Sequence, residues 1–138
     1  MPRADENWLS GFSQGLFALA DANGCELIGG DTTQGPLNIA ITVMGETPHG
    51  QSVLRSTAQT VDDIYVSGHL GDARLALEVF QGYLSVPQAV FDLARARLET
   101  PTPRMALGTA LRGVATAMAD VSDGLLGDLG HLLKASGV

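Results

Sequence analysis

Two short strings in the sequence place carboxylates beside glycine and hydroxyl side chains. In the first, residues 29–33 read Gly-Gly-Asp-Thr-Thr and follow a short apolar run. Paired glycines let the backbone approach a ligand closely and present N–H groups to an anion. Asp31 adds a hard oxygen ligand of the kind that Mg²⁺ prefers. The string is therefore a candidate phosphate and metal site, although such a string taken alone more often forms a simple turn in which the aspartate bonds its own loop.

The second string, residues 120–124, reads Asp-Val-Ser-Asp-Gly and lies between an apolar run and a predicted helix. The positive end of a helix dipole favours anions, so phosphate oxygens or a metal–phosphate group could dock there. The simpler alternative is that Ser122 caps the helix and Asp123 satisfies its dipole. That alternative leaves Asp120 without a structural role.

Arg55 is a third candidate, because it is the only basic residue between Arg3 and Arg74. A guanidinium can bind a phosphate through two parallel hydrogen bonds. Taken alone, an exposed or ion-paired surface arginine explains this residue more simply.

Several other chemistries are excluded by their missing motifs. No G-x-x-x-x-G-K-[ST] string exists and the only lysine is Lys134, so a P-loop nucleotide site is excluded. Residues 68–72 lack the spacing of a dinucleotide fingerprint, and no G-x-S-x-G elbow supports a serine hydrolase. The three histidines lack metal-ligand spacing.

The elements that must position these residues follow from apolar periodicity. Steps of three and four residues, with their capping signals, predict helices at residues 5–23, 72–82, 86–98, 104–112 and 123–135. Alternation and short apolar runs predict strands at residues 25–28, 37–43, 63–67 and 115–121. The interleaving predicts an α/β (α+β) fold, and the break between Gly45 and Gly50 predicts a boundary.

Composition is that of a globular protein with no basic surface. The chain has 138 residues, 45% of them hydrophobic, which fits one domain or two incomplete halves. A formal net charge of −7 without a basic stripe argues against nucleic-acid binding, and the acidic side chains serve solubility or hold divalent cations. No stretch of the sequence is apolar enough to span a membrane, so no membrane partner is expected. Cys25 lies in an apolar run, which predicts a core position. As the single cysteine it allows no intrachain disulfide, and a reducing cytoplasm is the expected location.

Taken together and in order, the strings resemble the signature of the thiamine-monophosphate kinases, within the aminoimidazole ribonucleotide synthetase-like superfamily. The resemblance covers nearly the whole chain, at residues 27–46, 54–56, 62–73, 101–104 and 120–137. Other superfamily members, such as aminoimidazole ribonucleotide synthetase and selenophosphate synthetase, resemble these strings less.

The resemblance implies that ATP, as co-substrate, phosphorylates thiamine monophosphate to thiamine diphosphate, with Mg²⁺ as cofactor. It implies magnesium ligands at Asp31, Asp120 and Asp123, and nucleotide contacts at Gly30, Asp31, Arg55 and Ser122. It implies no catalytic nucleophile. That agrees with phosphoryl transfer, which needs positioning and charge neutralisation more than covalent chemistry.

The resemblance also implies that the chain is an internal fragment of a two-domain fold. Residues 1–53 correspond to the end of an N-terminal, dimer-forming domain, and residues 54–138 to the start of a C-terminal α/β domain. Family members are more than twice as long, so most of the thiamine pocket is expected outside this chain, and Thr60-Val61 departs from the usual Pro-Gly. The isolated chain is expected to have little or no activity.

Two alternatives remain open at this point. The chain can be a non-catalytic module that forms a homodimer through the edge of residues 37–43, since an unpaired strand edge needs a partner. It can also belong to another ATP-dependent synthetase of the same superfamily.

Overall fold

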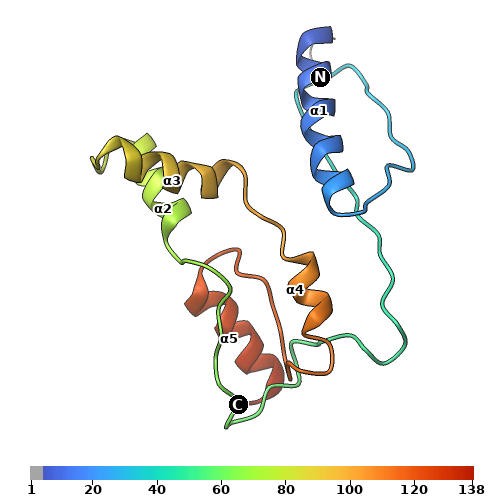
Figure 1. The fold of residues 1–138 in the computed structure, drawn as a ribbon, viewed down its shortest axis with the longest axis vertical. Coiled ribbons are helices and arrows are strands. Elements are labelled where there is room, and N and C mark those ends of the chain that lie inside the picture. Colours follow the sequence, from blue (N-terminus) through green and yellow to red (C-terminus); the bar gives the residue numbers. More distant parts are fainter. Residues whose placement is uncertain (1–4) are drawn as a thin grey trace. The chain divides into compact units, whose positions relative to one another are not determined.

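The computed structural model describes residues 5–138, which form five helices and no strand (Figure 1). The helices are α1 (Glu6–Ala22), α2 (Asp72–Phe80), α3 (Gln88–Glu99), α4 (Met105–Ala110) and α5 (Leu125–Ser136). All five predicted helices are confirmed, and each observed end lies within two residues of its predicted one. Local periodicity and capping residues are therefore sufficient to locate the helices of this chain.

The chain divides into two compact units, with the boundary between Glu46 and Thr47. In the first unit, α1 begins with a side-chain cap, because Asp5 Oδ1 accepts a hydrogen bond of 2.9 Å from the backbone N–H of Trp8. The rings of Trp8 and Phe12, one turn apart, stack with their centroids 5.3 Å apart. The remainder of the described first unit is irregular chain.

In the second unit, α2 and α3 are the only helices of the described chain that pack against each other. Ala76 of α2 and Ala94 of α3 have exposed fractions of 0% and 3%, and small side chains of this kind allow two helices to approach closely. Phe80 and Phe91 meet edge to face, with centroids 5.2 Å apart. The guanidinium of Arg95 lies 5.7 Å from the centroid of the Phe80 ring.

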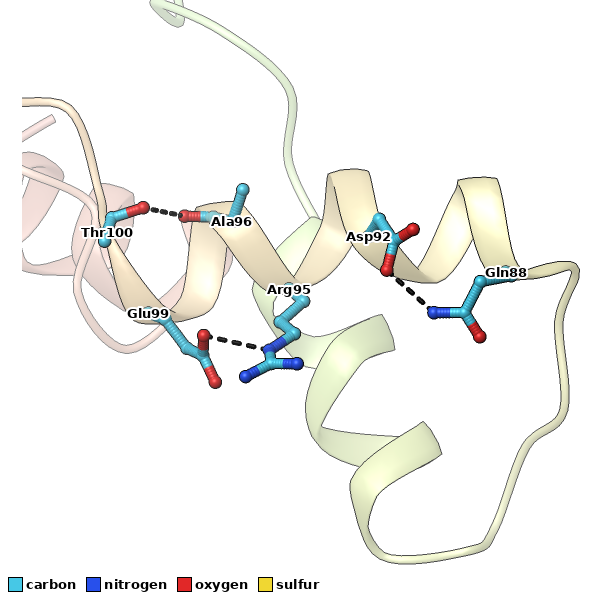
Figure 2. Close-up of polar contacts among 6 residues, drawn as sticks. All are labelled: Gln88, Asp92, Arg95, Ala96, Glu99 and Thr100. Atoms are coloured by element: carbon cyan, nitrogen blue, oxygen red, sulfur yellow. Dashed lines mark hydrogen bonds and ion pairs between the residues drawn. The ribbon is translucent and has the colours of Figure 1, made fainter.

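The exposed surface of α3 is stabilised by polar pairs four residues apart (Figure 2). Gln88 Nε2 donates to Asp92 Oδ1 at 2.7 Å, and Arg95 Nε pairs with Glu99 Oε2 at 2.9 Å. The bond from Glu99 raises the pKa of Arg95. At the end of the helix, Thr100 Oγ1 donates to the Ala96 carbonyl at 2.9 Å. Such pairs support a helix modestly, because both partners remain in contact with water.

The predicted strands at residues 25–28, 37–43, 63–67 and 115–121 do not form in the described chain. The α/β class is therefore not confirmed, although the helical half of the prediction is. The physical reason is that a strand exists only through hydrogen bonds to a neighbouring strand. One backbone bond reaches one of these regions, from Met118 N to the Leu54 carbonyl at 3.2 Å, and a single bond does not make a ladder.

Apolar side chains of the predicted strands remain exposed. Along residues 37–43 the exposed fractions are 58% for Leu37, 49% for Ile39, 63% for Ile41 and 77% for Val43. Cys25 is also exposed, so its predicted place in a core is wrong. The reason is the same, since the adjacent segment lacks the sheet that would cover it. Within residues 5–138, no helix combines the length and hydropathy needed to cross a bilayer.

Candidate functional site

The loop before α5 is held by a carboxylate from the first turn of that helix. Asp128 Oδ2 accepts hydrogen bonds from the backbone N–H groups of Ser122, at 2.8 Å, and Asp123, at 3.1 Å. These two bonds, together with a smaller contribution from the N–H of Gly124, lower the pKa of Asp128 because they stabilise its charged form. The charged carboxylate therefore fixes the backbone on which two predicted site residues stand.

Ser122 does not cap α5, which corrects the simpler alternative drawn from the sequence. The N-cap is Gly124, whose φ is 117° and whose position makes no side-chain capping bond. Asp128 instead holds the loop before the helix, because one of its oxygens accepts from the backbone N–H groups of Ser122 and Asp123, which precede the N-cap. The side chains of Asp120, Ser122 and Asp123 are exposed, and no hydrogen bond of the described chain uses their oxygens.

The loop that carries Arg55 is held by the other end of α5. Ser136 Oγ donates to the Arg55 carbonyl at 2.9 Å and accepts from the backbone N–H of Ala58 at 3.0 Å. The neighbouring Leu54 carbonyl accepts the bond from Met118. The Arg55 side chain itself is exposed. Its backbone is thus fixed by groups far along the chain, while its guanidinium faces solvent.

A second set of bonds ties residues 54–62 to the segment before Asp120. Thr57 Oγ1 donates to the Thr116 carbonyl at 2.5 Å, and Thr116 Oγ1 donates to Asp62 Oδ2 at 2.6 Å. The backbone N–H of Gln59 donates to the same Asp62 oxygen at 2.8 Å. The bond from Thr116 and then that from Gln59 lower the pKa of Asp62. Sequence analysis missed this network.

The second unit therefore brings two of the three predicted loops together. Met118 is bonded to Leu54, next to Arg55, and Asp120 follows Met118 by two residues. Two residues of extended chain span about 7 Å, so Asp120 begins close to the Arg55 loop. Gly30 and Asp31 lie exposed in the first unit, and Gly30 has a φ of 149°, which favours glycine at that position. Convergence of all three loops stays a prediction.

The oxygen donors at these positions fit Mg²⁺ in kind. Carboxylates are its preferred protein ligands, and the ion is commonly held by one or two of them together with substrate phosphates. Within residues 5–138, no group of three or more histidine, cysteine, aspartate or glutamate side chains gathers as a complete metal site. Asp120 and Asp123 therefore suit a partial coordination shell that phosphate oxygens would extend.

Sequence reasoning missed the residues that hold the loops. Asp128 carried a usable signal, since an acidic residue in the first turn of a helix commonly accepts from the loop before it. Ser136 carried none, because its partners lie 78 and 81 positions away along the chain. A polar residue in the last turn of a helix does not by itself indicate a distant partner.

Comparisons with known proteins identify the class of fold to which this chain is similar. Residues 1–47 match the family described as AIR synthase related protein, N-terminal domain. The structure superposes with a TM-score of 0.93 on the crystal structure of a thiamine-monophosphate kinase from Stenotrophomonas maltophilia K279a. That protein is 48% identical to this chain, and the alignment covers 99% of this chain and 45% of the other. The fold is therefore of the AIR synthase related type.

Curated relatives of this chain are also thiamine-monophosphate kinases. Thiamine-monophosphate kinases from Salmonella typhimurium and Escherichia coli K12 are 46% and 44% identical to it, each over 99% of this chain. The Bacillus subtilis kinase is 32% identical over 95% of it. The chain spans 42% of the length of each of these relatives. The resemblance inferred from the sequence motifs is thereby confirmed: the chain is a homologue of part of the thiamine-monophosphate kinases.

Proposed function

We propose that the chain provides part of the site in which ATP phosphorylates thiamine monophosphate to thiamine diphosphate. The observation that carries the proposal is the similarity to a thiamine-monophosphate kinase over 99% of this chain, with a TM-score of 0.93. The bonded loops of the second unit support it, because they fix the backbone at Arg55, Ser122 and Asp123 while leaving the side chains exposed.

In this proposal the acidic residues hold magnesium and the remaining candidates hold the nucleotide. Asp31, Asp120 and Asp123 bind Mg²⁺, which neutralises phosphate charge when bound. Gly30 and Asp31 contact the nucleotide where the glycine lets the backbone approach closely, Ser122 offers a hydroxyl, and Arg55 offers a guanidinium suited to a phosphate.

The charges of the chain explain why cations are needed. Both reactants are anionic, and the chain itself has a net charge of −7. Arg55 is the only arginine or lysine between Arg3 and Arg74, and Lys134 is the only lysine in the sequence. Divalent cations held by the aspartates therefore supply the positive charge that the side chains do not. We also propose a cytoplasmic location, where ATP and Mg²⁺ are supplied.

The isolated chain is expected to have little activity, because it spans 42% of the length of its relatives. A chimera tests the proposal directly. In it, this chain replaces the aligned segment of the Stenotrophomonas maltophilia kinase, and formation of thiamine diphosphate from ATP, Mg²⁺ and thiamine monophosphate is measured. Activity within about tenfold of the unaltered kinase supports the proposal.

Substitutions in the chimera separate the site from the scaffold. Asp123→Asn removes a charged metal ligand without changing side-chain size, and it is expected to lower kcat by a hundredfold or more. Asp92→Asn is the matched control, because Asp92 lies on α3 and its carboxylate, within residues 5–138, hydrogen-bonds only with Gln88. An inactive chimera that folds, or equal activity in both variants, would contradict the proposal.

A homodimer through residues 37–43 is a further part of the proposal. Its support is the exposed alternating apolar face of Leu37, Ile39, Ile41 and Val43. Such a face suits one side of a sheet, and pairing would turn this segment into the strand predicted from its sequence. Light scattering on the chimera tests it: Ile41→Lys is expected to give monomers, whereas a monomeric chimera without the substitution argues against it.

A further inference from the structure

Helix α5 bonds a candidate site loop near each of its ends. Asp128, in the first turn, accepts the backbone N–H groups of Ser122 and Asp123. Ser136, the last residue of the helix, bonds the Arg55 carbonyl. Figure 1 shows this end of α5, drawn in red, beside the green chain that precedes α2. The two anchors are eight positions apart in the helix, which is about 12 Å along the axis.

We propose that Asp128 and Ser136 are positioning residues, which set the separation and orientation of the Ser122–Asp123 loop and the Arg55 loop around the nucleotide phosphates. The inference rests on the proposed function and goes beyond it, because neither residue is expected to touch nucleotide or metal. Helix α5 acts as a rigid spacer between two loops that contact the same ligand.

The Asp128 contact is suited to positioning because it uses only backbone groups of the loop. A single oxygen, Oδ2, takes both N–H donors, which restricts the peptide planes at Ser122 and Asp123. The hydroxyl of Ser122 and the carboxylate of Asp123 take no part and stay available to phosphate and metal. Gly124, with a φ of 117°, permits the sharp entry into the helix that this contact requires.

The Ser136 contact performs the same task at the other loop. Its hydroxyl both donates to Arg55 and accepts from Ala58, so it closes the turn between them. Both partners are backbone groups, and the Arg55 guanidinium stays exposed. A guanidinium that binds two phosphate oxygens needs a fixed origin, since small displacements of a positioning group lower rates strongly.

The kinase chimera tests the inference through Asp128→Ala, Asp128→Asn and Ser136→Ala. Controls are Asp92→Ala on α3 and Ser13→Ala on α1, where Ser13 Oγ donates to the Leu9 carbonyl within its own helix. Asp128→Ala is expected to lower kcat at least tenfold and to raise the Mg²⁺ concentration for half-maximal rate. Asp128→Asn, which keeps a side-chain acceptor, is expected to recover part of the loss. Ser136→Ala is expected to raise KM for ATP at least fivefold.

A second readout does not depend on turnover. Amide hydrogen exchange at Ser122 and Asp123 is measured in the full chimera, and Asp128→Ala is expected to accelerate it at least tenfold while Asp92→Ala leaves it unchanged. Rates are compared well below the melting temperature of each variant, so that unfolding does not account for them.

The outcomes distinguish the two proposals. Variants at 128 and 136 that match their controls in kcat, KM and Mg²⁺ dependence would overturn the inference and leave the proposed function standing. Faster exchange with unchanged kinetics would also overturn it, since it assigns Asp128 a structural role only. A folded but inactive parent chimera would overturn the proposed function, and the inference would fall with it.

Discussion

Thr116 Oγ1 donates a hydrogen bond of 2.6 Å to Asp62 Oδ2 across 54 positions of the chain. The same carboxylate oxygen accepts from the backbone N–H of Gln59, and Thr57 returns a bond to the Thr116 carbonyl. The network joins the loop of Arg55 to the segment that leads to Asp120. It therefore supports the candidate site without containing any of its predicted residues.

Acid is expected to weaken this network. The bonds from Thr116 and Gln59 lower the pKa of Asp62 below the ordinary value of 3.8, so the folded chain binds this proton less readily than the unfolded chain. The stabilisation is complete above pH 3.8 and is lost as the pH falls through the lowered folded value. Thermal unfolding at pH 6 and pH 3 checks it: Asp62→Asn is expected to lose less stability on acidification than the unaltered protein.

Asp92→Asn serves as the control for acid sensitivity. It removes an exposed carboxylate that bonds Gln88 on α3 and leaves the Asp62 network intact. Its stability is expected to fall on acidification as much as that of the unaltered protein. Equal acid sensitivity in the Asp62 and Asp92 variants would contradict the role assigned to Asp62.

Substituting Gly124 is expected to strain the start of α5. Its φ of 117° and ψ of 147° lie in a region that residues with a Cβ rarely adopt, although no atom beyond the glycine and its two chain neighbours stands within 4 Å of the added Cβ. Gly124→Ala should therefore cost about 1–3 kcal/mol through backbone conformation alone. Gly127→Ala, inside the same helix and equally unhindered, should stabilise by about 0.5–1 kcal/mol. Denaturant unfolding measures both, and effects of the same sign would contradict the argument.

The contact between α2 and α3 should tolerate no added volume at Ala76. This side chain has an exposed fraction of 0%, and Ala76→Leu forces a larger group into a closed contact. We expect a loss of about 1–3 kcal/mol in the free energy of unfolding. Ala73→Leu, on an exposed position of the same helix, should change stability by less than about 0.5 kcal/mol. A comparable loss in both variants would indicate that helix propensity, not packing, decides the result.

The helices could be predicted from the sequence because their determinants are local. The stripe of Trp8, Phe12 and Leu16 lies within a few turns, and Asp5 caps the same helix through a contact three residues away. Whether the strand predicted at residues 37–43 forms could not be decided from local sequence in this way. Its alternation is as regular as any helix stripe, yet a strand requires a neighbour, and the described chain brings none to it.

The candidate site was predictable in its residue types and not in its supports. Asp31 and Asp123 stand out as carboxylates beside glycine, Asp120 precedes Asp123 by three residues, and those strings resemble a known signature. Asp128 holds the loop before α5, where one of its oxygens accepts from the backbone amides of Ser122 and Asp123. Ser136 acts on residues far along the chain, where periodicity and motif spacing carry no information.

Arg55 gives the sharpest test of the nucleotide contact. Its guanidinium is exposed while its carbonyl is bonded to Ser136, so Arg55→Ala removes the side chain and leaves the backbone anchor in place. In the kinase chimera, KM for ATP should rise about tenfold to a hundredfold, as expected for loss of hydrogen bonds worth about 1.5–3 kcal/mol. Arg55→Lys should recover little, since an ammonium keeps the charge and loses the two parallel bonds. Arg74→Ala, which breaks an ion pair with Glu78 on α2, is the control, and an Arg55→Lys variant with normal KM would mean that charge alone, not bidentate geometry, binds the phosphates.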